Sequence, residues 1–234
     1  MKQMHETQLQ ILKKLLFTPS ARYAEMKPNS EMENNKYDFH LDQLIKLGYV
    51  IKNDKTYSLT PLGKGYANEI DSEKIEITKQ SKISAWICGI REQDGKKEFL
   101  IGTRLKHPFF GCQGFMTCKV RYGEKIIEAA KRELKEEANL TGDPVMVGVK
   151  HFRVFDKKTN QLLEDKFMYL LKVINPEGEL HNTEEGEFAW TEDVRKYITK
   201  PFEDIEEFMK YVEEADKFSG KISFVEIDHW SEKF

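Results

Sequence analysis

Three carboxylates crowd the end of one predicted helix, and they carry the clearest chemical signal in the chain. The run from Gly123 to Asn139 has apolar residues at helical spacing, so we expect an amphipathic helix there. On a helical wheel, Glu133, Glu136 and Glu137 lie beside the apolar stripe rather than on the solvated face. These side chains are therefore expected near the protein interior, in the last turn of the helix.

This placement is unfavourable for a purely structural helix. Like charges three and four residues apart cost roughly 0.2–0.5 kcal/mol per pair, and carboxylates at a helix C-terminus oppose the macrodipole by about 0.3–1 kcal/mol each. Arg132 can pair with Glu136 or Glu128, but one arginine cannot neutralise three carboxylates. A hard divalent cation can, since Mg²⁺ and Mn²⁺ take oxygen ligands. The plain alternative is an acidic cluster without function, because 33 % of the chain is charged.

The residues around this cluster resemble the Nudix hydrolase family, whose box reads G-x5-E-x7-R-E-U-x-E-E-x-G-U, with U an aliphatic residue. The chain reads CKVRYGEKIIEAAKRELKEEANL from Cys118 to Leu140. The positions that match in type and spacing are Glu124, Arg132, Glu133, Leu134, Glu136, Glu137 and Leu140. Two box glycines are replaced, by Cys118 and by Asn139, and asparagine is the non-glycine residue that best tolerates a left-handed helix end. The charged positions are intact, while the loop before the helix is altered.

The resemblance implies an enzyme that cleaves a diphosphate linked to another group, usually a nucleoside, with Mg²⁺ or Mn²⁺ as cofactor. It points to Glu133 and Glu137 as metal ligands, and to Glu136 as a further ligand or as the catalytic base. Arg132 is expected to orient the carboxylates, and Glu124 to hold the loop or to contact the metal through water. Candidates for an additional metal ligand from a distant loop are Glu184 and Glu185, followed by Glu164 and Asp165.

Basic and aromatic residues outside these carboxylates are the candidates for substrate binding. Lys119 and Arg104 are expected to contact phosphate, Arg104 because it lies late in a predicted strand. A base or nucleoside is expected to stack on aromatic rings. The aromatic candidates are Phe109, Phe110, Phe115 and Trp190. The structural alternatives are a solvated strand end for the arginine and core positions for the aromatic side chains.

The composition excludes several other classes of protein. With 234 residues and a net charge of −3, the chain has no global basic excess that would point to nucleic acid. No apolar run approaches the ~20 residues that span a bilayer, and the N-terminus lacks the apolar region of a signal peptide. The three cysteines lack CxxC spacing, which supports neither a disulfide framework nor a zinc site. We therefore expect a cytoplasmic protein without membrane contact.

The second part of the chain, residues 76–234, is predicted to form an α/β domain. Strands are predicted over residues 83–91, 98–105, 145–155, 166–173, 187–190 and 222–227, with a second amphipathic helix over 202–218. Strands and helices in this order suit a mixed sheet between helices. This agrees with the α/β/α sandwich that the Nudix resemblance implies.

The first part, residues 1–75, is predicted to form a separate small domain. We expect helices over residues 4–17, 20–26 and from 30 or 34 to 47, strands over 49–51 and 56–59, and a last helix from residue 61. This order, together with the segment FHLDQLIKLGYVIKNDKTYSLTPLGKGYA, resembles the winged helix-turn-helix family. The polar stretch over residues 68–80 is expected to connect the two domains.

Winged helices often bind DNA through their third helix. Here the predicted third helix region carries acidic residues as well as lysines, whereas a phosphate-facing surface should be basic. The acidic residues are Glu31, Glu33, Asp38 and Asp42, against Lys36 and Lys46. Dimerisation, or docking on the catalytic domain, is therefore the favoured use. The alternative is DNA binding through Arg22, Lys27, Lys36, Lys52 and Lys55.

The intact carboxylates and the acidic third helix favour an enzyme with a small nucleotide as substrate. The first candidate is a nucleoside triphosphate, for example an oxidised one such as 8-oxo-dGTP, cleaved to the monophosphate and pyrophosphate. ADP-ribose or another nucleotide sugar is the close second. A ligand-sensing transcription regulator is the alternative of a different class, because some Nudix domains joined to winged helices sense ADP-ribose and control promoters. DNA and a second copy of the chain stay open as further partners.

Overall fold

A computed structural model of the protein describes residues 4–71, 75, 77–202, 204–220, 222 and 224. The chain divides into two compact units, one up to Lys79 and one over Gln80–Ile227. The sequence placed the boundary near residue 75. Across the described part of the chain, no helix combines the length and the apolar character needed to cross a membrane.

The first unit follows the order of helices and strands expected from the sequence, apart from a two-residue strand at the start of the predicted helix over residues 20–26. It contains α1 (Glu6–Leu16), β1 (Ala21–Arg22), α2 (Tyr23–Met26), α3 (Asn34–Lys46), β2 (Val50–Asn53), β3 (Thr56–Leu59) and α4 (Pro61–Asn68). The first strand joins the β2–β3 hairpin in a sheet of order β1-β3-β2. The Thr60-Pro61 pair starts α4 as predicted, because the Thr60 hydroxyl accepts the N–H of Gly63 at 3.0 Å.

The core of this unit lies between α1, α3 and the small sheet. Ile11 and Leu12 of α1 and Tyr37 and Leu44 of α3 are completely buried, and Tyr57 of β3 joins the same cluster. Burying each large apolar side chain contributes about 1.5–3 kcal/mol relative to leaving it in water. The unit therefore has an apolar core of its own.

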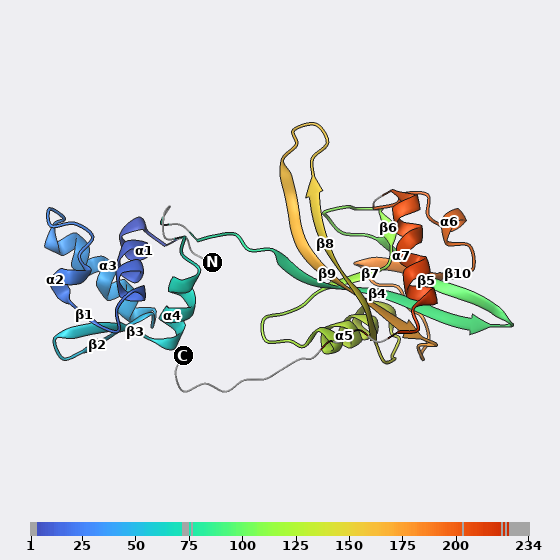
Figure 1. Ribbon diagram of the computed structural model, residues 1–234, viewed down its shortest axis with the longest axis horizontal. Coiled ribbons are helices and arrows are strands. Elements are labelled where there is room, and N and C mark those ends of the chain that lie inside the picture. Colours follow the sequence, from blue (N-terminus) through green and yellow to red (C-terminus); the bar gives the residue numbers. More distant parts are fainter. Residues whose placement is uncertain are drawn as a thin grey trace. The chain divides into compact units, whose positions relative to one another are not determined.

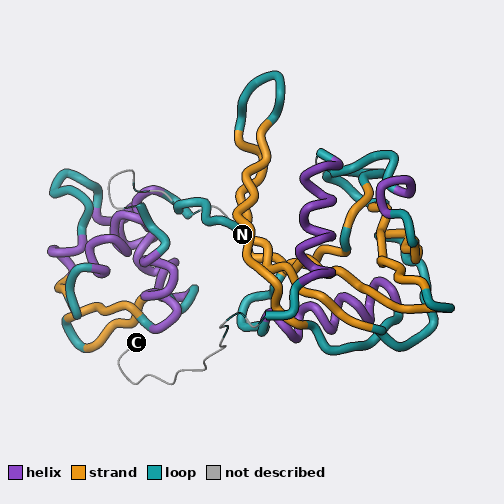
Figure 2. Tube along the Cα trace, turned by 45° about the vertical axis from the view of Figure 1, so that its right-hand side comes forward, coloured by secondary structure: helices purple, strands orange, loops and turns teal. Residues whose placement is uncertain are grey.

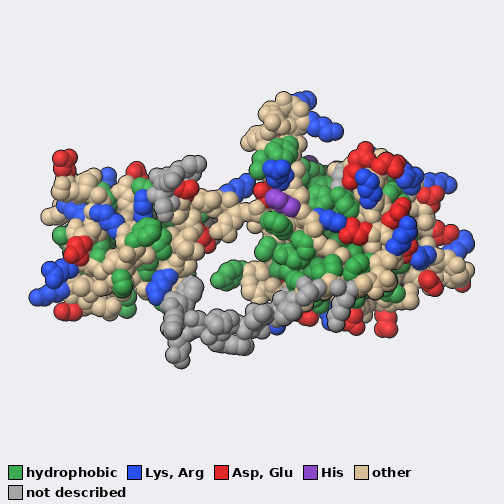
Figure 3. Space-filling model, viewed as in Figure 1, with side chains coloured by type: hydrophobic (Ala, Val, Ile, Leu, Met, Phe, Trp, Pro, Cys, Tyr) green, Lys and Arg blue, Asp and Glu red, His purple; other side chains and the backbone are tan. Residues whose placement is uncertain are grey.

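The exposed side chains of α3 are acidic, apolar and basic, with no excess of basic residues. Asp38, Phe39 and Asp42 are exposed on this helix, as are Lys36 and Lys46. On the visible face of the unit, acidic and basic side chains are interspersed with apolar ones (Figure 3). This is not the concentrated positive charge that phosphate backbones attract.

The second unit is built on a mixed sheet (Figure 1). Its strands are β4 (Lys82–Gln93), β5 (Lys96–Arg104), β6 (Gln113–Gly114), β7 (Met116–Lys119), β8 (Val145–Phe155), β9 (Leu162–Ile174) and β10 (Gly186–Thr191). The strand order is β10-β5-β4-β9-β8, with β6 paired to β5 and β7 to β4. Strands β4 and β9 run parallel, whereas the other pairs are antiparallel. The predicted mixed sheet is therefore confirmed.

One long helix packs on each face of this sheet. Leu134 of α5 (Ile126–Ala138) joins the cluster that contains Ile87 of β4, and Phe208 of α7 (Ile205–Lys217) joins the cluster that contains Trp86 and Cys88. Successive strand residues point to opposite faces, so the odd-numbered residues of β4 face α5 and the even-numbered ones face α7. This arrangement is the predicted α/β/α sandwich.

Several boundaries differ from the prediction. The short strands β6 and β7 and the helix α6 (Val194–Tyr197) were not predicted. Helix α5 begins at Ile126, so Glu124 precedes the helix. Strand β9 begins earlier than expected, because the β8–β9 hairpin continues beyond Lys82, the first residue of β4, and projects from the sheet (Figure 2). The predicted closing strand over residues 222–227 lies mostly outside the described residues.

Candidate active site

The last turn of α5 places the predicted carboxylates. Ala130 and Leu134 are completely buried and fix the helix against the sheet. The helix ends at Asn139, whose φ of 55° and ψ of 28° are left-handed, as predicted for the residue that replaces the box glycine. Its side-chain amide donates to the carbonyl of Glu179 at 2.9 Å. Asparagine therefore keeps the left-handed cap and also ties the helix end to the following loop.

Arg132 is the centre of the charge network in this region. Its Nε and Nη2 donate to the two oxygens of Glu124 at 2.7 and 3.1 Å, and its Nη1 donates to Glu133 and to Glu136 at 3.0 Å each. The hydrogen bond from Arg132 lowers the pKa of Glu124 to about 2, and that of Arg132 is raised in return. This fork-shaped pairing fixes the loop before α5 against the helix.

Glu133 and Glu137 form the enclosed part of the cluster. Their side chains are only 13 % and 16 % exposed. Burial raises the pKa of Glu133, and the charge of Glu137 adds to the rise, although the hydrogen bond from Arg132 counteracts it. Glu137 also accepts a hydrogen bond from the Thr183 hydroxyl at 2.9 Å. Two carboxylates are thus held close together in a poorly solvated place.

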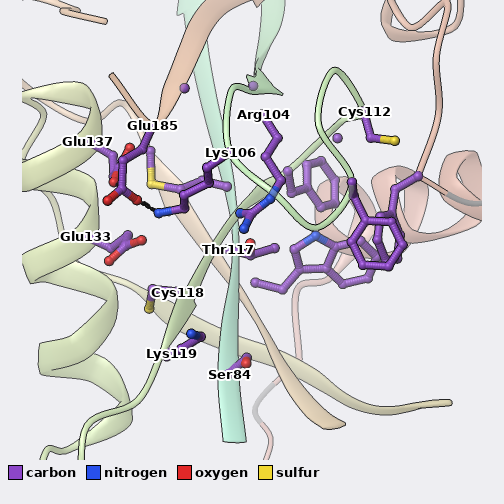
Figure 4. A pocket seen from close by; sticks show the side chains of 18 of the residues that line it. Ser84, Arg104, Lys106, Cys112, Thr117, Cys118, Lys119, Glu133, Glu137 and Glu185 are labelled. Atoms are coloured by element: carbon purple, nitrogen blue, oxygen red, sulfur yellow. Dashed lines mark ion pairs between the residues drawn. The ribbon is translucent and has the colours of Figure 1, made fainter. Parts of the chain in front are cut away.

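The donor set around Glu133 and Glu137 fits a hard divalent cation. Glu185, from the loop before β10, approaches the same opening (Figure 4). The Lys106 ammonium forms an ion pair with Glu185 and lies 4.0 Å from Glu137 Oε1. Among the described residues, no three acidic, histidine or cysteine side chains converge on a single point as they stand. The positive charge between these carboxylates is supplied by Lys106.

Glu136 is in a different environment from its two neighbours. Its side chain is 52 % exposed, and its Oε2 accepts from Arg132 and lies 3.8 Å from an Nη atom of Arg121. It still lines the same cavity. Glu136 therefore lies at the rim of the cluster rather than inside it.

Cys118 lies beneath α5, where the family pattern has a glycine. The residue is buried, and its Sγ lies 3.6 Å from the carbonyl oxygen of Ala129. Burial raises the pKa of the thiol to about 12, so it stays protonated at neutral pH. The cysteine acts as an apolar packing residue, and the alternation of buried Met116 and Cys118 with exposed Thr117 and Lys119 is the pattern of strand β7.

A cavity of about 600 Å³ connects the carboxylates with an aromatic wall. Trp86 is the centre of this wall, with its ring centroid 5.4 Å from those of Phe115 and Phe152. Phe109 packs edge-to-face on Phe202 at 4.4 Å. All five rings line the cavity. One end of the cavity is therefore charged and the other is aromatic.

Only some of the predicted substrate-binding residues line this cavity. Arg104 and Lys119 do, but the Arg104 guanidinium donates to the carbonyls of Pro108 at 2.7 Å and His107 at 3.5 Å, which ties down the loop before β6. Phe110 is 58 % exposed and is not among the described lining residues. The other two aromatic candidates from this part of the chain, Phe109 and Phe115, do line the cavity.

Trp190 is also outside the described lining of the cavity. The register explains this, because Phe188 pairs with Gly102 beside the cavity and Trp190 pairs with Leu100, one step further along β5. The Trp190 ring instead lies under the guanidinium of Arg91, at 4.4 Å. Trp190 packs against the apolar cluster between the sheet and α5. This agrees with the alternative given above, in which the aromatic candidates are core residues.

The sequence did not single out Lys106, Thr183, Lys82 or Lys166, which the fold brings to this region. Lys106 lies in the loop after β5. The three lysines line the cavity, and Thr183 contacts Glu137. Glu164, weighed as a distant metal ligand, is instead paired with Lys82 and Lys166. No spacing rule joins residues from β4, β9 and two loops, so this grouping needed the three-dimensional fold.

Comparison with known families identifies the second unit. The model of the NUDIX domain matches residues 81–218, which is more than half of the chain. The protein therefore belongs to the NUDIX domain family, in agreement with the box over residues 118–140.

Solved structures that are similar to this chain include the NUDIX domain of NrtR and two MutT proteins. The NUDIX domain of Shewanella oneidensis NrtR, solved in complex with ADP ribose, is 14 % identical with a TM-score of 0.51, covering 68 % of this chain and 97 % of that one. The MutT protein of Methanosarcina mazei Go1 is 21 % identical, with a TM-score of 0.47 and coverage of 61 % and 100 %. The MutT NUDIX hydrolase of Burkholderia pseudomallei is 19 % identical, with a TM-score of 0.45 and coverage of 58 % and 98 %. At these identities only the fold is shared.

Proposed function

We propose that this protein hydrolyses the diphosphate linkage of a nucleoside diphosphate compound, with Mg²⁺ or Mn²⁺ as cofactor. The observation that carries the proposal is the placement of Glu133 and Glu137, two poorly solvated carboxylates at the wall of one cavity. Keeping two like charges together away from water is costly unless a cation joins them. The family membership supports the same chemistry.

Each acidic residue of the site has a proposed role in holding the cation or activating water. Glu133 and Glu137 would hold the ion, with Glu185 as the additional ligand from the loop before β10. When bound, the cation neutralises the diphosphate and lowers the pKa of the attacking water. Arg132 keeps Glu133 and Glu136 in position through its hydrogen bonds. Glu136, the most exposed of the three carboxylates, is the candidate base.

The remaining lining residues would bind the substrate. Lys119 and Arg121 lie beside the carboxylates, where their positive charge attracts the phosphate groups. The aromatic wall at the other end offers rings on which a base can stack. A volume of about 600 Å³ lies within the ordinary range for small-molecule sites. We keep a nucleoside triphosphate as the first candidate, with ADP-ribose or another nucleotide sugar as the second.

A substrate panel tests this proposal and separates the two candidates. The full-length protein is incubated with nucleoside triphosphates, including 8-oxo-dGTP, and with ADP-ribose, in the presence of Mg²⁺ or Mn²⁺. Release of pyrophosphate with a nucleoside monophosphate indicates a triphosphate substrate, whereas AMP with ribose 5-phosphate indicates ADP-ribose. No hydrolysis of any compound by the wild-type protein would contradict the enzymatic function.

A second candidate is a regulator that senses ADP-ribose. It is favoured by two observations, the ADP ribose bound to the NrtR NUDIX domain and the winged-helix order of the first unit. The acidic residues Asp38 and Asp42 on the outward face of α3 argue against a DNA contact at that helix. A sequence-specific shift of DNA by the whole chain, altered by ADP-ribose, would support this candidate over the enzyme.

A further inference from the structure

A second charged cluster lines the cavity outside the Nudix box. Lys82 begins β4, and Glu164 and Lys166 lie on β9. Lys82 Nζ is 3.2 Å from Glu164 Oε1, and Lys166 Nζ is 2.9 Å from Glu164 Oε2. The side chains of Glu164 and Lys166 are 15 % and 14 % exposed. Two lysines and one glutamate in this small space leave one positive charge in excess.

Glu164 is held in its ionised form between the two lysines. Burial alone would raise the pKa of Glu164, but the hydrogen bonds from Lys166 and Lys82 hold that pKa below its usual range. A single carboxylate can compensate only one of the two ammonium groups. Each ammonium has three N–H donors, and each donates only one bond to Glu164 in the structure. The cluster therefore has donors and charge to offer an anion.

The sheet register places this cluster near the box but separate from it. Ser84 pairs with Lys119 of β7, and Lys82 pairs with Lys166 of β9. On the same face of β4, Lys82 therefore lies two residues beyond Ser84, about 7 Å along the strand. This is the face of the sheet that α7 covers, and the cavity is lined both by this cluster and by the α5 carboxylates. A ligand with its diphosphate beside those carboxylates can therefore extend its nucleoside part through the cavity towards the cluster.

Aromatic rings lie next to the same lysines. Phe152 is the register partner of Lys166 across β8 and β9, and the Lys166 ammonium lies 5.2 Å from the ring centroid of Phe202. Both rings line the cavity. A nucleoside held against these rings would have its ribose close to an uncompensated positive charge.

We propose that Lys82 and Lys166 bind a second phosphate of the ligand, a phosphate monoester on the ribose, remote from the diphosphate at the α5 carboxylates. The inference rests on the proposed function in one respect, because it takes the occupant of the cavity to be a nucleotide. A compact ammonium group suits a phosphate monoester, which it binds as a point charge. The substrate class is then a nucleoside diphosphate compound that also carries a 2′- or 3′-phosphate.

Mononucleotides test this site without hydrolysis, because they contain no anhydride. Calorimetric titration of the full-length protein compares AMP with adenosine 2′,5′-bisphosphate and adenosine 3′,5′-bisphosphate. We expect at least one bisphosphate to bind about 10-fold more tightly than AMP, the gain that one charge-assisted phosphate contact supplies. In Lys166→Met this preference should fall below about threefold, while the affinity for AMP changes by less than about twofold.

Two further variants keep the test decisive. Lys150→Met is the matched control. Lys150 lies on β8, two residues from Phe152, the register partner of Lys166, and its ammonium is paired with Glu214 at 2.6 Å. Lys150 is not among the described residues that line the cavity. This variant should retain the preference. Lys82→Met, at the more exposed start of β4, tests the site if Lys166→Met does not fold. Equal affinities of the wild-type protein for AMP and both bisphosphates would overturn the proposal, as would a preference that survives in a folded Lys166 or Lys82 variant.

The binding titration and the hydrolysis panel can contradict the second phosphate site and the enzymatic function independently of each other. A preference for a bisphosphate without hydrolysis of any compound would contradict the enzymatic function and leave the second phosphate site standing. Hydrolysis of a substrate that has no 2′- or 3′-phosphate, with no preference among the mononucleotides, would support the enzymatic function and overturn the second phosphate site.

Discussion

Helices α5 and α3 have the same length, 13 residues, and both carry acidic side chains. On α5, Glu133 and Glu137 are poorly solvated, line a cavity and contact residues from two loops. On α3, Asp38 and Asp42 are exposed to water, and Asp38 accepts a hydrogen bond from the Tyr23 hydroxyl. Acidic residues on a helix are ordinary where water solvates them. They indicate a ligand site where the fold withdraws them from water.

The strongest test of this contrast removes one carboxylate from each helix. Glu137→Gln should reduce turnover at least about a hundredfold, because the proposed ligand of the cation is lost. Asp42→Asn on α3 should leave turnover unchanged and serves as the matched control. Turnover is measured on the best substrate of the panel, with circular dichroism to show that both variants fold. Unchanged turnover in Glu137→Gln would rule out the site on α5.

The charge network behind the carboxylates should give the next largest effect. Arg132→Lys keeps the charge but loses the forked contact with Glu124, so we expect about 10-fold lower turnover and about 1–2 kcal/mol lower stability. Lys46→Met, at the exposed end of α3, should change stability by less than about 0.5 kcal/mol. Urea unfolding measures both variants. Equal stability of the two variants would show that the network does not hold the loop before α5.

The pH dependence of stability tests the pairing of Glu124 with Arg132. The folded pKa of Glu124, about 2, lies below the value of 4.5 for a free glutamate. Its contribution is therefore present above about pH 4.5 and is lost as the pH falls towards about 2. Glu124→Gln should lower the thermal midpoint by about 2–4 °C near neutral pH, and the difference from the wild type should shrink below about pH 4. A constant difference across this range would contradict the assignment.

The smallest effect is expected for DNA at the first unit. The whole chain should show no sequence-specific gel shift at about 0.15 M salt, because the exposed Asp38 and Asp42 of α3 offset its exposed Lys36 and Lys46. The double variant Asp38→Asn, Asp42→Asn removes two negative charges and should raise non-specific affinity only a few-fold. A specific, salt-dependent shift by the wild-type chain would instead favour the regulator.

The sequence predicted the fold well where a long periodic pattern was present. The apolar stripe of α5, the left-handed cap at Asn139 and the Thr60-Pro61 start of α4 were all anticipated from local chemistry. Strand β7 was not, because four residues give too short an alternation to stand out beside the loop before it. A periodic pattern predicts a helix or a strand reliably only when the element is long enough to repeat the pattern several times.

The candidate site was predictable on one helix and unpredictable across the sheet. Arg132 was expected to orient the carboxylates, and the structure shows it bonded to Glu124, Glu133 and Glu136. The four aromatic candidates were chosen by residue type alone. Phe109 and Phe115 are among the described residues that line the cavity, whereas Phe110 and Trp190 are not. Phe188, one step along the strand from Trp190, lines it instead. The residue type indicates which kind of contact a side chain can make, whereas the strand register determines which side chain faces the cavity.

The parallel pairing of β4 with β9 also constrains how a newly made chain can fold. Lys82 pairs with Lys166 and Ile90 with Ile174, so the central pair of the sheet joins segments far apart in the sequence. Such contacts form slowly, because a long loop must close first. During synthesis the first unit can fold on contacts of its own, whereas β4 waits for its partner until residue 174 has left the ribosome. A chain that stops after α5 would leave the apolar side chains of β4 without their central neighbour, and we expect such a fragment to aggregate.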